Sequence, residues 1–119
     1  MSDQRFQISA EDSVQILQFS LPPMMDIIEI DTLIDSVLKQ LETSGKARWI
    51  VDLSQTEYLG SSMLGLFVNM REKVRSAGGK LVLCGMSPAL TRIFKTCCLE
   101  RLFTIAKSRA DAMAVVSRY

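Results

Sequence analysis

The sequence predicts an α/β protein with a mixed, mostly parallel β-sheet and helices packed against it. In the stretch 49–84, two short apolar runs, 49–53 and 80–84, flank one long helical pattern. Such an arrangement is typical of a βαβ unit with parallel strands, which are buried on both faces and need not alternate polar and apolar residues. The chain of 119 residues is large enough to bury a core, so residues 1–119 are expected to form a single domain.

The first part of the chain predicts a hairpin and a helix. Residues 6–9 and 14–19 are expected to be strands, with 10–13 as their turn, and the prolines at 22 and 23 end the pair. Asp26 and Glu29 have capping-box spacing, and Gly45 supplies a typical helix stop. Between them, apolar residues recur at helical spacing: Ile30, Leu33, Ile34, Val37, Leu38 and Leu41.

Three more helices and two more strands are expected after the strand 49–53. The helix that follows Ser61-Ser62 carries an inward stripe and ends at Gly78-Gly79, before the strand 80–84. Ser87-Pro88 starts the next helix, with serine as cap and proline at the first position, and residues 102–105 form a last strand. Ser108 and Asp111 then open a closing helix. The inward residues expected on these helices are Met63, Phe67, Met70 and Val74; Leu90, Ile93, Phe94 and Cys97; and Ala112, Met113 and Val116.

The composition gives no sign of a nucleic-acid or membrane partner. Fourteen basic residues against thirteen acidic ones leave a net charge of +1, whereas nucleic acid or an anionic membrane favours a basic patch. No apolar run is long enough to cross a bilayer, and the first five residues lack the apolar stretch of a signal peptide. Because the three cysteines fit no disulfide framework, a cytoplasmic location is expected.

The residues needed for catalysis or for cofactor binding are missing from the sequence. There is no histidine, so a Ser-His-Asp triad cannot form, and serine without a base is a weak nucleophile. The run Gly60-Ser61-Ser62-Met63 does not match the Gly-x-Ser-x-Gly elbow, and no glycine-rich phosphate loop is present. The cysteine spacing suits no metal site. We therefore expect neither an enzyme nor a cofactor or metal.

The functional site is expected at the junction between the strand 49–53 and the helix after it. Ligands usually bind at such junctions in open α/β sheets. One interpretation is that Ser61 or Ser62 only caps the helix. The other is that a hydroxyl is phosphorylated, since a phosphate in the first helical turn meets free amides and the positive end of the helix dipole. The residues alone leave both interpretations open.

Three further groups have alternative interpretations. Met24 and Met25 form either an adaptable contact surface or a plug at the end of the sheet. Cys97 lies in phase with the core and is expected to be buried as a small apolar residue, whereas Cys98 leans away; a redox role is the alternative for both. The basic group within 71–75 is either a solvated face or a partner contact.

Several motifs resemble the STAS domain, the family of bacterial anti-sigma factor antagonists and related modules. Val51-Asp52-Leu53-Ser54 is similar to the family's strand that ends in Asp-Leu-Ser. Residues 59–66, Leu-Gly-Ser-Ser-Met-Leu-Gly-Leu, resemble its signature Ile-Asp-Ser-Ser-Gly-Leu-Gly-Leu. The resemblance covers nearly the whole chain, because three more segments and one acidic residue also match: 79–83, 87–89, 99–103 and Asp26, which precedes the first helix.

The resemblance implies a regulatory module that controls transcription by switching partners. In the family, a histidine-kinase-like serine kinase that doubles as an anti-sigma factor phosphorylates the second serine of the pair. This serine corresponds to Ser62, with Ser61 as second choice. The unphosphorylated domain binds the kinase and releases the sigma factor, and a phosphatase resets the cycle. We expect the partner to contact the helix start and neighbouring loops: Met24, Met25, Asp26, Gly60, Ser61, Ser62 and Met63.

The sequence departs from the family pattern at the site itself. Gly60 stands where the signature has aspartate, Met63 stands where it has glycine, and Pro23 replaces a loop glycine. These departures favour an alternative function, in which a non-phosphorylated STAS subunit binds within a transporter or lipid-trafficking complex.

Overall fold

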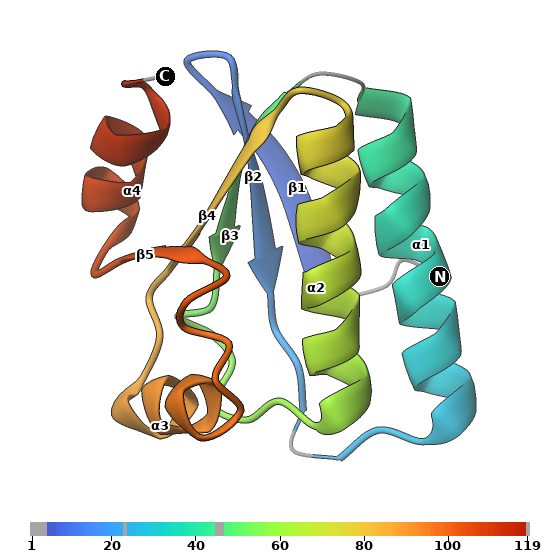
Figure 1. Cartoon of the computed structure of the whole chain (residues 1–119). Helices are drawn as coiled ribbons and strands as arrows, with labels where there is room; N and C mark the ends of the chain where they lie inside the picture. Colours follow the sequence, from blue (N-terminus) through green and yellow to red (C-terminus); the bar gives the residue numbers. More distant parts are fainter. Residues whose placement is uncertain (1–4, 23, 45–46, 119) are drawn as a thin grey trace.

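A computed structural model describes residues 5–22, 24–44 and 47–118. These residues form a five-stranded sheet flanked by helices (Figure 1). The predicted order of strands and helices is confirmed over these residues. The elements are β1 (Phe6–Glu11), β2 (Val14–Phe19), α1 (Ile27–Ser44), β3 (Arg48–Asp52), α2 (Ser61–Ser76), β4 (Lys80–Cys84), α3 (Pro88–Thr96), β5 (Thr104–Ala106) and α4 (Arg109–Val116).

The sheet is mixed and mostly parallel, as the sequence predicts. Its strands follow the chain order β1-β2-β3-β4-β5; β1 runs antiparallel to β2, and the other neighbouring pairs are parallel. Helices α1 and α2 lie side by side on one face, α4 covers the other face, and α3 lies near the carboxyl ends of the strands (Figure 1). The starts of α1 and α2 therefore meet at the end of the sheet where parallel strands usually carry a site.

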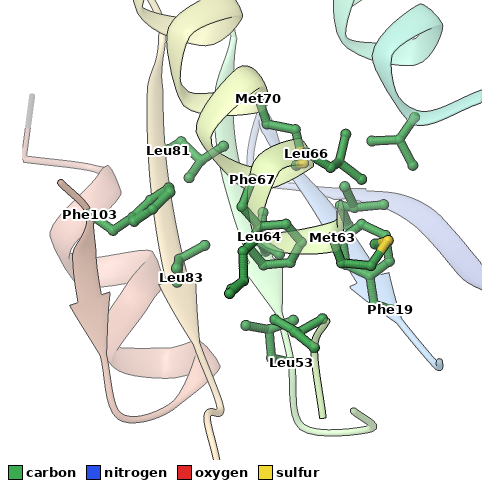
Figure 2. Close-up of a cluster of buried hydrophobic side chains, with 14 of the residues drawn as sticks. Phe19, Leu53, Met63, Leu64, Leu66, Phe67, Met70, Leu81, Leu83 and Phe103 are labelled. Atoms are coloured by element: carbon green, nitrogen blue, oxygen red, sulfur yellow. The ribbon is translucent and has the colours of Figure 1, made fainter. Parts of the chain in front are cut away.

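The core has two parts because successive side chains of a strand point to opposite faces of the sheet. In β3, Trp49 and Val51 pack toward α1 and α2, whereas Ile50 packs toward α4. The larger part includes Phe19, Phe67 and the other side chains of Figure 2, beneath α2. The sheet is thus buried on both faces, which accounts for the continuous apolar runs in the sequence.

The helices α1, α3 and α4 start with the caps that the sequence predicts. The Asp26 carboxylate accepts a hydrogen bond from the Glu29 amide at 2.8 Å, and the Glu29 carboxylate accepts one from the Asp26 amide at 3.3 Å, so the capping box is confirmed. Ser87 caps α3 and Ser108 caps α4 through their hydroxyl oxygens. Gly45, the expected stop of α1, and Pro23 lie outside the described residues.

Two predicted element boundaries are wrong by a few residues. The first strand continues through Glu11, so the turn contains only Asp12 and Ser13, both with positive φ (50° and 67°). Two such residues match the right-handed twist of a hairpin. The last strand begins at Thr104 rather than at 102, because the Leu102 amide is bonded to the Leu99 carbonyl in a turn.

Cys97 is exposed, so the prediction that it is buried in the core is wrong. Helix α3 ends at Thr96 and Cys97 is its C-cap, so the buried stripe of the helix ends at Phe94. The Cys98 amide bonds to the Lys95 carbonyl, and the Leu99 amide bonds to the Phe94 carbonyl. This is a Schellman motif, with Cys98 in the left-handed position (φ 58°) that glycine usually occupies.

We predict that Cys98→Gly stabilises the protein by roughly 0.5–1 kcal/mol, because it removes left-handed strain at the end of α3. Cys97→Gly is the matched control: Cys97 has an ordinary φ of −89°, so glycine there adds only chain entropy to the unfolded state. Thermal unfolding under reducing conditions measures both variants. A melting temperature that falls equally in the two would contradict the strain at Cys98.

Candidate functional site

The two serines occupy the first two positions of α2, and both are exposed. Gly60 is the N-cap, with φ −81° and ψ 174°, and no side chain caps this helix. The interpretation that Ser61 or Ser62 serves as the cap is therefore wrong. The hydroxyl pair lies at the surface in the first helical turn, where backbone amides lack helical partners and negative charge is favoured.

A groove of about 330 Å³ at this helix start brings most of the predicted site residues together. One wall comes from the segment between β2 and α1, and the other comes from the loop between β3 and α2. Its lining includes Met24, Met25, Gly60, Ser61, Ser62 and Met63. Asp26 is exposed as the cap of α1 but does not line the groove.

The rim of the groove carries large exposed apolar side chains. Met24 is 87% exposed, and Tyr58, which also lines the groove, is 58% exposed. Ile27 and Ile28, in the first turn of α1 and outside the groove lining, are also exposed, at 76% and 77%. Side chains that are this apolar and this exposed commonly mark a protein-binding surface when they lie together.

Met63 belongs to the core as well as to the groove. It is only 4% exposed and lies near Phe19 beneath the first turn of α2 (Figure 2). The methionine that replaces the family's glycine therefore fixes the start of α2 against the sheet. Steric crowding does not require a glycine at position 60, because a Cβ there would meet only the Tyr58 ring, at 3.9 Å.

Thr56 joins the two walls of the groove. Its hydroxyl is buried, donates a hydrogen bond to the Phe19 carbonyl at 3.0 Å, and accepts a longer one from the Leu21 amide at 3.4 Å. The loop that carries Ser62 is thereby tied to the segment that carries Met24 and Met25. Sequence reasoning missed Thr56, because a single threonine in a polar loop gives no signal of burial.

Asp52 holds the end of β3 from the opposite face of the sheet. The Asp52 residue is 5% exposed, and its carboxylate accepts hydrogen bonds from the Ser54 amide at 2.9 Å and from Arg109 of α4 at 2.8 and 3.1 Å. Burial raises the pKa of Asp52, but the bonds from Ser54 and Arg109 outweigh it and leave the pKa below its usual value. The pair anchors α4 to the strand that leads into the site.

Cys84 lies beside this ion pair in the core. Burial, with the Asp52 charge second, raises the pKa of the Cys84 thiol to about 11. The thiol thus stays protonated at neutral pH and packs as a small apolar group. Cys97 and Cys98 are exposed, outside the lining of the groove.

Neither a metal site nor a membrane span is found in the part of the chain that the structure describes. Within the described ranges, no three His, Cys, Asp or Glu side chains are grouped so that they could hold a metal ion. None of the helices in these ranges has the length and apolar character needed to span a membrane. The groove can offer a protein partner exposed hydroxyls and an apolar rim.

Comparison with known proteins gives consistent matches. A family model described as STAS domain matches residues 7–112. BtrV of Bordetella bronchiseptica, named as an anti-sigma factor antagonist, is 30% identical over 70 residues, which cover 59% of this chain and 60% of BtrV. The chain thus matches less than two thirds of this relative's length.

Solved structures show the same fold. An anti-sigma-factor antagonist (STAS) domain protein from Planctomyces limnophilus matches with a TM-score of 0.83 and 17% identity, covering 94% of this chain and 97% of that one. The Bacillus cell fate determinant SpoIIAA in its phosphorylated form matches with a TM-score of 0.66 and 16% identity, covering 93% and 98%.

We predict that Asp52→Asn destabilises the protein by about 1–3 kcal/mol at neutral pH, because Arg109 loses its charged acceptor. The pKa of Asp52 is lower in the folded protein than in the unfolded chain. The carboxylate therefore stabilises the fold at pH values above the unfolded-state pKa of about 3.9, and this stabilisation is lost as the pH falls through the folded-state pKa. The difference between wild type and Asp52→Asn should shrink below about pH 4.

Urea unfolding between about pH 7 and pH 3 measures this difference. Asp31→Asn, on the exposed face of α1, is the control for loss of one carboxylate. A destabilisation by Asp52→Asn that stays constant across this pH range would show that the charge of Asp52 does not contribute.

Proposed function

This chain belongs to the STAS domain family, and on that premise we propose that it is an anti-sigma factor antagonist-like module switched by phosphorylation of Ser62. Its partner is a histidine-kinase-like serine kinase that also acts as the anti-sigma factor, and a phosphatase reverses the modification. One observation carries the proposal: Ser62 is exposed in the first turn of α2, on the wall of a groove with an apolar rim. Ser61 is the second candidate.

The module supplies the acceptor hydroxyl, and the partner supplies the chemistry. The kinase transfers the γ-phosphoryl group of ATP to the Ser62 oxygen. The bond from the γ-phosphorus to the bridging oxygen breaks, ADP leaves, and the hydroxyl proton passes to a base on the kinase. This division of labour fits a chain without histidine, since an isolated serine hydroxyl lacks an activating base. The phosphatase later hydrolyses the phosphoserine and restores the hydroxyl.

Phosphorylation acts on the contact surface and leaves the fold intact. A phosphate adds a charge of about −1.5 to −2 at neutral pH. At the first turn of α2 the helix dipole and free amides accommodate this charge in the isolated module. In a complex the same phosphate would have to be desolvated against the groove's apolar rim, which disfavours binding. Similarity in fold to SpoIIAA, whose phosphorylated form has been solved, supports this proposal.

A second candidate function is a STAS subunit that binds without a phosphoryl switch, in a transporter or lipid-trafficking complex. Gly60 and Met63 favour it, because the site lacks the signature carboxylate and has a methionine in place of glycine. Intact-mass analysis of the protein from its native host separates the two functions. A phosphoform at Ser62 supports the switch, and its consistent absence supports the second candidate.

We predict that Ser62→Asp weakens binding to the partner kinase roughly 30- to 1000-fold, the effect of losing about 2–4 kcal/mol. Ser62→Ala should bind like the unphosphorylated protein, because the Ser62 side chain does not cap α2. Calorimetric titration measures the affinities, and circular dichroism should be unchanged in both variants. The switch fails if the aspartate and alanine variants bind the kinase equally well.

We also predict that Met24→Ser weakens kinase binding by about 1–2 kcal/mol, or roughly 5- to 30-fold, without loss of stability. The reason is that Met24 lines the groove and is 87% exposed, so it contributes little to the core. Ile105→Ser, which removes an exposed apolar side chain from β5, is the control. Equal affinities for Met24→Ser and Ile105→Ser would exclude the rim from the contact.

A further inference from the structure

We propose that the chain has a second binding surface, which takes an acidic segment of a protein partner. This surface, the basic cleft, is a cavity of about 250 Å³ between the last turns of α2, the start of β4 and the approach to β5. The residues that line it and carry the argument are Arg71, Arg75, Lys80, Leu102, Phe103 and Thr104. None of the described residues that line the cleft is acidic.

The cations come from two elements, and Arg71 is held in place by contacts with the chain. Arg71 donates from Nε to the Leu102 carbonyl at 2.5 Å, and its side chain is only 22% exposed. Its guanidinium also lies 3.6 Å from the Glu72 carboxylate. Arg75 is exposed four residues further along α2, on the same face of the helix, and Lys80 begins β4. The positive charge of the cleft is therefore partly preorganised.

The helix dipole accounts for only part of this cluster. Cations near the end of a helix are favourable within its last turn, where α2 has Lys73 and Arg75. Lys73 pairs with Glu42 of α1 at 3.2 Å and lies away from the cleft. Arg71 precedes the last turn, and like charges at positions four apart on a helix destabilise it slightly. Glu72 offsets part of the Arg71 charge, and an anionic group in the cleft would offset the charge of Arg75 as well.

The surroundings of the cleft favour a protein segment over a small anion. Leu102 is 39% exposed and lines the cleft, and Ile105 on β5 is 40% exposed. Strand β5 is at the edge of the sheet, with β4 as its neighbour. A segment that combines carboxylates with apolar side chains would contact both the cations and these two residues. A free phosphate would use only the cations.

The basic cleft is separate from the Ser62 groove. Arg71 is nine residues beyond Ser62 in α2, which places it roughly 14 Å further along the helix axis. The two surfaces share none of their lining residues. Both can therefore be occupied at once, and the second surface does not depend on the phosphorylation of Ser62.

The test uses the full chain and a fluorescent hexapeptide, Glu-Leu-Glu-Glu-Leu-Glu, in anisotropy titrations. We expect saturable binding that weakens with salt and becomes about tenfold weaker in Arg75→Glu. Arg92→Glu, a charge reversal at an exposed position of α3, should bind like wild type. Leu102→Ser should weaken binding of this hexapeptide but not of hexaglutamate. Ser62→Asp should bind the hexapeptide unchanged, even if the proposed switch fails.

Three results would overturn the second surface, given variants with unchanged circular dichroism. The first is no saturable binding to wild type. The second is an equal loss in Arg75→Glu and Arg92→Glu, which would reflect net charge alone. The third is a combination of two observations: Leu102→Ser binds both peptides as wild type does, and inorganic pyrophosphate displaces the peptides fully. Together they would identify a small-anion pocket.

Discussion

The buried hydroxyl of Thr56 joins the two chain segments between which the candidate site lies. It reaches from the loop after β3 to the Phe19 carbonyl at the end of β2, in a region where an unpaired polar group would cost about 1–3 kcal/mol. From the other face of the sheet, Asp52 and Arg109 fix the same end of β3. These bonds fix the end of β3 and the loop that leads to α2, and they form the frame from which the helix with Ser62 starts.

This frame explains how a modification at the surface can regulate binding without refolding. Met63, directly after Ser62, is buried and anchors the first helical turn, whereas the hydroxyl itself is exposed. The groove beside it has one wall from the β2–α1 segment, and the exposed side chains of Met24 and Tyr58 give it an apolar rim. A charge placed at Ser62 therefore changes the surface that a partner meets, while the packing below it stays the same.

Periodicity and capping predicted most of the fold, because both depend on local sequence. The inward stripes of α1 and α2 and the caps at Asp26, Ser87 and Ser108 are confirmed. The errors lie where tertiary structure decides: α3 ends before Cys97, and the chain turns before β5 starts. The hydroxyl pair was located from the strand–helix junction. The roles of Thr56 and of the Asp52–Arg109 pair could not be predicted. Their hydrogen bonds join residues that are 37 and 57 positions apart, and no local sequence pattern contains such contacts.

The most direct measurement compares one protein sample before and after complete phosphorylation of Ser62. Amide NMR spectra of both forms, each titrated with the partner kinase, report the fold and the binding together. Our account predicts that phosphorylation abolishes binding while amide shifts change only around the start of α2 and the groove. Retained binding by the phosphorylated form, or shifts spread through the whole sheet, would contradict it.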